Sequence, residues 1–217
     1  MKEIMTVTEA LVKEAKELSD FRNNVKDYLQ NYGECYDKFT VTENDTYLGH
    51  VSETAIIHYL QNVYSDKLEI HKWSEKFDLD RVRSAVMNNI NKPEEILYVR
   101  EYFYDRYDIE ILNKETGKKL LIDVKTAETS KTPQMYWNFL YPVVQNQKDG
   151  KDCVILCYYY KQEDANKIIL IGYLTEDRIS QYNILKAGTK TRFGTINQID
   201  NYETKVKDYK PLSELFK

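Results

Sequence analysis

The chain has 217 residues, of which 42% are hydrophobic and 30% charged, and its formal net charge is −4. This is the composition of a globular domain with its own core, and no apolar run reaches the length of a membrane span. Three cysteines without CxxC spacing argue against a disulfide framework or a zinc site. The acidic balance argues against binding nucleic acid through a broad basic surface. The N-terminus lacks the apolar core of a signal peptide, so we expect a cytoplasmic protein.

The first ninety residues are predicted to be mainly helical. Helices are predicted over 7–31, 51–64 and 78–90. Thr6 and Glu9 have the spacing of a capping box at the start of the first helix. Asp78 is the predicted N-cap of the third helix. Residues 1–48 are therefore interpreted as a helical N-terminal extension.

From Ile96 onward, short apolar runs bounded by turn residues predict strands. The predicted strands span 96–104, 107–112, 119–125, 153–160 and 168–174. Residues 133–147 are interpreted as a mainly helical crossover that Pro142 interrupts. Thr175 is expected to cap a short helix, and the tail from Lys205 is expected to dock its last apolar turn on the body.

Acidic and basic side chains come together in a hairpin predicted around Gly117. Alternation along its second strand sets Asp123 and Lys125 on one face, and Asp108 begins its first strand. The residues flanking Asp123 are apolar, and a buried carboxylate is costly unless it meets a cation or hydrogen-bond donors. Carboxylate oxygens suit a hard divalent cation such as Mg²⁺, and a nearby lysine orients a water or holds a phosphate.

Asp108, a gap of fourteen residues and Asp123-X-Lys125 resemble the active-site signature of the PD-(D/E)xK nucleases, the restriction-endonuclease-like superfamily. Tyr107 stands where that signature has proline, and Asp123 stands where glutamate is commoner. The resemblance implies an α/β fold with an αβββαβ core and a mixed central sheet flanked by helices. One domain is expected over the whole chain. It would have its catalytic core at 49–180 and a C-terminal loop and tail at 181–217.

The resemblance further implies a Mg²⁺-dependent endonuclease that hydrolyses DNA, with Mn²⁺ as a substitute and a restriction, phage or defence role. Asp108 and Asp123 would bind the metal, and Lys125 would orient the attacking water and stabilise charge on the phosphate. Glu53 is a candidate third ligand, although it is also a favourable charge in a first helical turn. Asp105 is the rival of Asp108. A homodimer with one site per strand is the simplest double-strand cutter.

Other residues are candidates for contact with nucleic acid. Thr126 and Lys131 follow the signature, while Lys186, Lys190 and Arg192 lie in a basic loop that could equally be a solvated surface. Glu110 is expected either to support the site or to face solvent. Trp137 is interpreted as a core residue. Two alternatives to the leading function stay open. One is a nucleic-acid-binding or assembly protein with the fold but no catalysis, and the other is a nuclease acting on RNA or structured DNA.

Overall fold

The computed structural model describes residues 3–35, 42–146, 150–163, 165–191 and 196–216. The chain divides into two compact units, which we call the strand unit (Met1–Thr6 with Leu120–Lys217) and the helical unit (Val7–Lys119). Their elements make the chain mixed α/β, as predicted. The assignment of the whole chain to a single domain stays a prediction. No helix within the described ranges is both long and apolar enough to cross a membrane.

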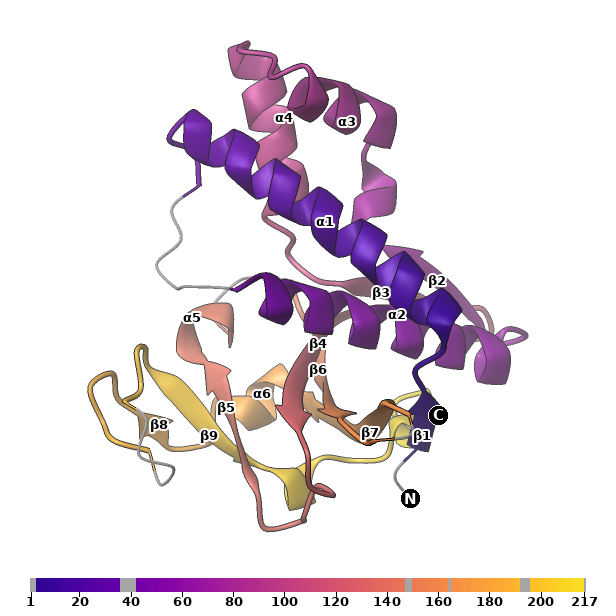
Figure 1. The fold of residues 1–217 in the computed structure, drawn as a ribbon. Coiled ribbons are helices and arrows are strands. Elements are labelled where there is room, and N and C mark those ends of the chain that lie inside the picture. The colour runs from indigo at the N-terminus through magenta and orange to yellow at the C-terminus, as the bar shows by residue number, and fades with distance from the viewer. Residues whose placement is uncertain (1–2, 36–41, 147–149, 164, 192–195, 217) are drawn as a thin grey trace. The chain divides into compact units, whose positions relative to one another are not determined.

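Four helices dominate the helical unit (Figure 1). They are α1 (Glu9–Asn31), α2 (Glu43–Tyr64), α3 (Leu79–Met87) and α4 (Pro93–Phe103). Strands β2 (Leu68–Lys72) and β3 (Ile109–Asn113) pair antiparallel, and the 3-10 turn η1 (Trp73–Lys76) follows β2. One core cluster joins α1, α3 and α4 through Val25, Leu29, Val82 and Val99, none of which is exposed.

The N-terminus of α1 differs from the prediction. Thr8 is its N-cap, and the Thr8 hydroxyl accepts a hydrogen bond from the Leu11 N–H at 3.2 Å. The predicted capping box of Thr6 and Glu9 is therefore wrong. Thr6 instead ends a strand, β1 (Glu3–Thr6), so the N-terminal segment is not wholly helical.

Helices α2 and α3 also begin at capping residues. Thr42 and Asp45 form a reciprocal capping box, with bonds of 2.9 and 3.1 Å, and α2 begins well before the predicted start at Val51. Asp78 caps α3 as predicted, because its carboxylate accepts from the backbone N–H groups of Asp80 and Arg81.

The predicted strand over 96–104 is wrong, because this segment lies in α4. Pro93 occupies the first helical turn, where its missing N–H costs nothing. Val99 and Phe103 are buried at a spacing of four residues, which is helical periodicity. The predicted three-strand meander is therefore wrong in its first strand, and β3 pairs instead with the unpredicted strand β2 in the sheet order β4-β3-β2.

The strand unit contains a mixed sheet in the order β1-β7-β6-β4. Its other strands are β4 (Lys119–Thr129), β6 (Cys153–Tyr160) and β7 (Lys167–Thr175). β4 and β6 run parallel, whereas β7 is antiparallel to both β6 and β1. A second sheet has the order β5-β9-β8, formed by β5 (Asn138–Pro142), β9 (Asn201–Lys205) and β8 (Ile184–Leu185). Short helical turns complete the unit: α5 (Val143–Asn146), α6 (Glu176–Ile179), η2 (Val206–Asp208) and η3 (Leu212–Glu214).

The predicted crossover helix over 133–147 is wrong in most of its length. Residues 138–142 form β5, which pairs with β9, and within the described part of this range, 133–146, only the four residues of α5 are helical. Tyr141, fully buried, packs with Val154, Leu156 and Tyr202 in the core of the strand unit. The tail docks as predicted, because Leu212 is 3% exposed.

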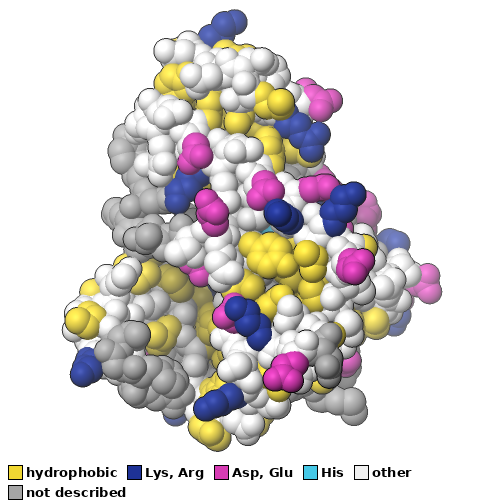
Figure 2. All heavy atoms as spheres, in the orientation of Figure 1, with side chains coloured by type: hydrophobic (Ala, Val, Ile, Leu, Met, Phe, Trp, Pro, Cys, Tyr) yellow, Lys and Arg dark blue, Asp and Glu magenta, His cyan; other side chains and the backbone are white. Residues whose placement is uncertain are grey.

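Charged side chains of both signs are intermingled on the face drawn in Figure 2. This agrees with the near balance of 31 basic and 35 acidic residues in the chain. Local groups of charge therefore matter more for binding than the net charge does.

Gly172 lies in β7 where the register with β6 shifts between Leu156 and Cys157. Its φ is +145°, and an added Cβ would collide with the carbonyl oxygen of Lys210. Tyr173 and Lys210 exchange two backbone hydrogen bonds, of 2.9 and 3.0 Å, beside this point. Neither backbone can withdraw without losing these bonds.

Gly172→Ala is therefore expected to lower the free energy of unfolding by about 2–3 kcal/mol through backbone strain and overpacking. Gly117→Ala is the matched control, because φ there is +68° and an added Cβ would meet nothing within 4 Å. The control should cost only about 1 kcal/mol. Urea denaturation measures both, and equal effects would contradict the close approach at Gly172.

Candidate functional site

Asp123 is the centre of a buried polar group in the strand unit, which we call the Asp123 cluster: Asp123, Lys125, Tyr141 and Lys151. Lys125 Nζ lies 3.0 Å from Asp123 Oδ1. Lys151 Nζ lies 3.1 Å from Oδ2, and the Tyr141 hydroxyl donates to the same oxygen at 3.0 Å. Lys151 Nζ also donates to the Tyr141 hydroxyl oxygen at 3.3 Å. The cluster thus sets two ammonium groups and a phenol on one carboxylate.

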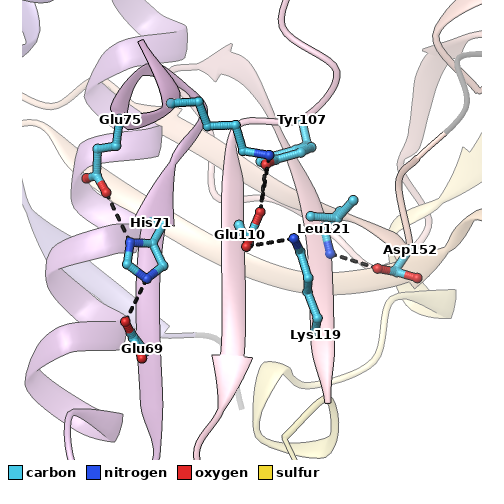
Figure 3. A network of polar contacts seen from close by, with 9 residues as sticks. Glu69, His71, Glu75, Tyr107, Glu110, Lys119, Leu121 and Asp152 are labelled. Atoms are coloured by element: carbon cyan, nitrogen blue, oxygen red, sulfur yellow. Dashed lines mark hydrogen bonds and ion pairs between the residues drawn. The ribbon is translucent and has the colours of Figure 1, made fainter. Parts of the chain in front are cut away.

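Strand geometry explains how the cluster forms. Asp123 and Lys125 are two residues apart on β4 and project from the same face, as predicted. Tyr141 comes from β5, and Lys151 directly precedes β6, the parallel neighbour of β4. Asp152, the next residue, fixes the start of β6 against β4 (Figure 3). Its carboxylate accepts from the Leu121 N–H at 2.7 Å, and its own backbone N–H donates to the Leu121 carbonyl oxygen at 2.8 Å.

The two lysines determine the charge state of Asp123. Burial alone would raise the pKa of its carboxyl, but the positive charges of Lys125 and Lys151 outweigh burial and lower the pKa to about 2. Asp123 is therefore ionised at neutral pH. Counting the carboxylate and two ammonium groups, the cluster carries one net positive charge.

A divalent cation fits only part of this arrangement. A carboxylate offers about four lone-pair positions, and three of them on Asp123 accept from Lys125, Lys151 and Tyr141. One position on Oδ1 is left for a hard cation. In the part of the chain that the structure describes, no group of three His, Cys, Asp or Glu side chains is arranged to hold a metal ion.

The other predicted metal ligands lie in the helical unit, around Arg22. Asp105 pairs with Arg22 at 3.3 Å, and Arg22 also donates to the carbonyl oxygen of Phe103. Burial lowers the pKa of Arg22, but the charges of Asp105, Asp108 and Glu53 more than compensate and raise it. Both Asp108 and its rival Asp105 thus lie within electrostatic reach of one cation.

Glu53 and Asp108 have further partners of their own within the helical unit. Glu53 Oε2 lies 3.5 Å from His50 Nδ1. Asp108 precedes β3, and its carbonyl oxygen accepts from the Trp73 N–H at 3.3 Å. Their roles as metal ligands stay predictions.

Glu110 supports structure in the helical unit (Figure 3). It accepts from the Tyr107 hydroxyl at 2.7 Å and pairs with Lys119 at 2.7 Å and Lys76 at 3.5 Å. Burial opposes ionisation, but hydrogen bonds from Lys119 and Tyr107 lower the pKa of Glu110. In the same view, His71 lies between Glu69 and Glu75, and hydrogen bonds to both raise the pKa of His71.

The predicted nucleic-acid contacts fall into different settings. Lys131 is exposed and lines a pocket beside β4, whereas the Thr126 hydroxyl is buried without a hydrogen-bond partner among the described residues. Lys186 pairs with Asp200 at 2.7 Å, and Lys190 is exposed and forms a β-bridge with Ile196. Arg192 lies outside the described residues.

Sequence reasoning missed Lys151 and Tyr141. Lys151 precedes the apolar run of β6, and a lysine in that position is normally interpreted as a solvent-exposed residue at the end of a strand. Tyr141 was assigned to a helix, whose periodicity gave it no relation to Asp123. The only available signal was the burial predicted for Asp123, which required donors from elsewhere in the chain.

No protein-family model matches this chain, and no curated protein matches it either.

Proposed function

We propose that this protein is a Mg²⁺-dependent nuclease that hydrolyses phosphodiester bonds of DNA at the Asp123 cluster. The observation that carries the proposal is the Asp123–Lys125 pair, held on one face of a β4 that is covered on both sides. A buried carboxylate beside a lysine, two residues apart on a strand, is the arrangement that the PD-(D/E)xK resemblance implies. A homodimer with one site per DNA strand is part of the proposal.

Three members of the Asp123 cluster have a proposed role. Asp123 would hold Mg²⁺, with Asp108 and Glu53 as further ligands from the resemblance. When bound, the ion supplies Lewis acidity to the phosphate and acidity to a water. Lys125, 23% exposed, would donate to a phosphate oxygen and stabilise the charge that develops there. Lys151, 6% exposed, is a positioning residue that fixes the Asp123 carboxylate.

The net positive charge of the cluster favours a second candidate function. Two ammonium groups on one carboxylate are suited to binding a phosphate even without catalysis. A nucleic-acid-binding protein of this fold would use the same residues. The two candidates differ only in whether a bond is broken.

Supercoiled plasmid incubated with the purified protein distinguishes them. The nuclease proposal expects nicking or linearisation with Mg²⁺ or Mn²⁺ and none with EDTA. The product ends should carry 5′-phosphate and 3′-hydroxyl groups, which a ligase seals. Plasmid that is retarded on a gel but uncut with either metal would favour the binding protein, and neither retardation nor cutting would contradict both.

A further inference from the structure

A pocket of about 950 Å³ opens in the strand unit beside the far end of β4. Its walls come from the end of β4, the loop 130–137, the start of β5, and Tyr158 and Lys161 at the end of β6. The aromatic lining residues are Tyr136, Trp137, Phe139 and Tyr158. This volume is that of pockets that hold small organic ligands.

The pocket lies along the same two strands, β4 and β5, that contribute to the Asp123 cluster. Ala127 lines the pocket and lies two residues beyond Lys125 on the same face of β4, which is roughly 7 Å along the strand. On β5, Phe139 lines the pocket and Tyr141 belongs to the cluster. One bound chain could therefore reach both places.

The aromatic side chains offer ring faces to a ligand. Tyr136 is 71% exposed, an unusual exposure for so large a ring. Trp137 is half-buried, and its indole meets the Tyr158 ring edge-to-face at 5.7 Å. Trp137 packs against the core of the strand unit, as predicted, but it remains partly exposed. Nucleobases stack on such faces whatever their sequence.

The charged residues that line this pocket carry one net positive charge, although the whole chain is acidic. Lys131 and Lys161 line it, and Lys161 pairs with Glu128 at 2.8 Å. Lys207 is exposed, and its backbone N–H donates to the Met135 carbonyl oxygen at 3.1 Å. The charged lining residues are Lys131 and Lys161 against Glu128. This excess of lysine complements a phosphate backbone.

We propose that this pocket binds an unpaired nucleotide of a single-stranded nucleic acid, with the base against Tyr136 and Trp137 and the phosphates near the lysines. Bases inside a duplex are stacked on each other, so their faces are closed to an aromatic wall, whereas unpaired bases can enter. The link between this pocket and cleavage rests on the proposed function. The phosphate to be cleaved would lie at the Asp123 cluster, a short distance along the bound nucleic-acid strand.

Fluorescence anisotropy of labelled 12-nucleotide single strands, measured in EDTA, tests binding without cleavage. DNA and RNA of the same sequence form two arms, and a blunt DNA duplex forms a third. Tyr136→Ala is expected to weaken single-strand binding about 5- to 100-fold. Leu97→Ala, at an exposed site in the helical unit, should change it less than twofold.

A second readout is independent of affinity. The chain has two tryptophans, so in Trp73→Phe the emission comes from Trp137 alone. Stacking predicts quenching of that emission on addition of a single strand. Binding without quenching and without an effect of Tyr136→Ala would overturn the proposal, as would tighter binding of the duplex or no binding at all.

The two proposals fail separately. Single strands that bind and quench Trp137, with no cleavage under any metal, would leave the pocket proposal standing and contradict the nuclease. If Tyr136→Ala cleaves single-stranded substrates at the rate of the wild type, the pocket proposal is contradicted and the nuclease proposal is not. Preference between the DNA and RNA arms identifies which nucleic acid the pocket takes.

Discussion

Metal-dependent cleavage of plasmid DNA is expected to fall at least about 100-fold in Asp123→Asn and in Lys125→Met. Asparagine keeps the shape of the side chain but loses the charge that would hold Mg²⁺. Methionine keeps most of the volume of lysine but removes the ammonium that would meet the phosphate. The initial rate of conversion of supercoiled plasmid to open circle, with protein in excess, measures both losses.

Lys118→Met is the matched control for Lys125→Met. Lys118 is an exposed lysine close in sequence, in the turn between β3 and β4, and its replacement should leave the rate within about twofold. Lys125→Met should also melt within a few degrees of the wild type, since its side chain is partly exposed. Full cleavage by either Asp123→Asn or Lys125→Met would falsify the assignment of the Asp123 cluster.

Calorimetry separates the roles of the same residues. Asp123→Asn should lose affinity for Mg²⁺ or Mn²⁺, whereas Lys125→Met should retain it, because the lysine is assigned to the phosphate. The predicted ligands outside the strand unit can be judged by the same titration. Asp108→Asn and Glu53→Gln should each weaken metal binding if the resemblance holds for them.

The hairpin residues could be predicted from the sequence because strand alternation is local. Asp123 and Lys125 share a face of β4 whatever the rest of the chain does, and the turn at Gly117 is closed by Asn113, which bonds to Lys118 at 2.9 Å. The burial of Asp123 also followed from its apolar neighbours. These parts of the site depend only on residues that lie close together in the sequence.

The remainder of the site depends on long-range pairing. Tyr141 reaches Asp123 only because β5 is a strand, and β5 pairs with β9, about sixty residues later. Ile96 to Phe103 contains residues common in strands, yet Pro93 and packing on α1 make it a helix. Over such short segments, intrinsic propensity is weaker than tertiary packing. The strand β5 and the helix α4 could therefore not be predicted from the local sequence.

Asp123→Asn is also expected to lower the free energy of unfolding by about 3–5 kcal/mol at neutral pH. The substitution leaves the Lys151 ammonium, 6% exposed, without its carboxylate. Glu128→Gln, on the same strand, is the control: Glu128 is exposed and pairs with Lys161, so its loss should cost at most about 1 kcal/mol. Urea denaturation at pH 7 compares the two.

The double variant Asp123→Asn/Lys151→Met should recover more than half of the lost stability. Methionine fills the space of the lysine stem without a charge, so no buried ammonium is left unpaired. A double variant as unstable as Asp123→Asn would show that the loss has another cause. A stable double variant that does not cleave DNA would in turn separate catalysis from folding.

The pH dependence of folding stability tests whether the two lysines stabilise the ionised form of Asp123. The pKa of the Asp123 carboxyl is about 2 in the folded protein and ~3.9 in an unfolded chain. The carboxylate therefore contributes its full stabilisation above about pH 4 and loses it as the pH falls through about 2. The stability difference between wild type and Asp123→Asn should narrow over this window, while the small difference for Glu128→Gln should not follow the same course. A difference that stays constant down to pH 2 would mean that the two ammonium groups do not hold Asp123 ionised.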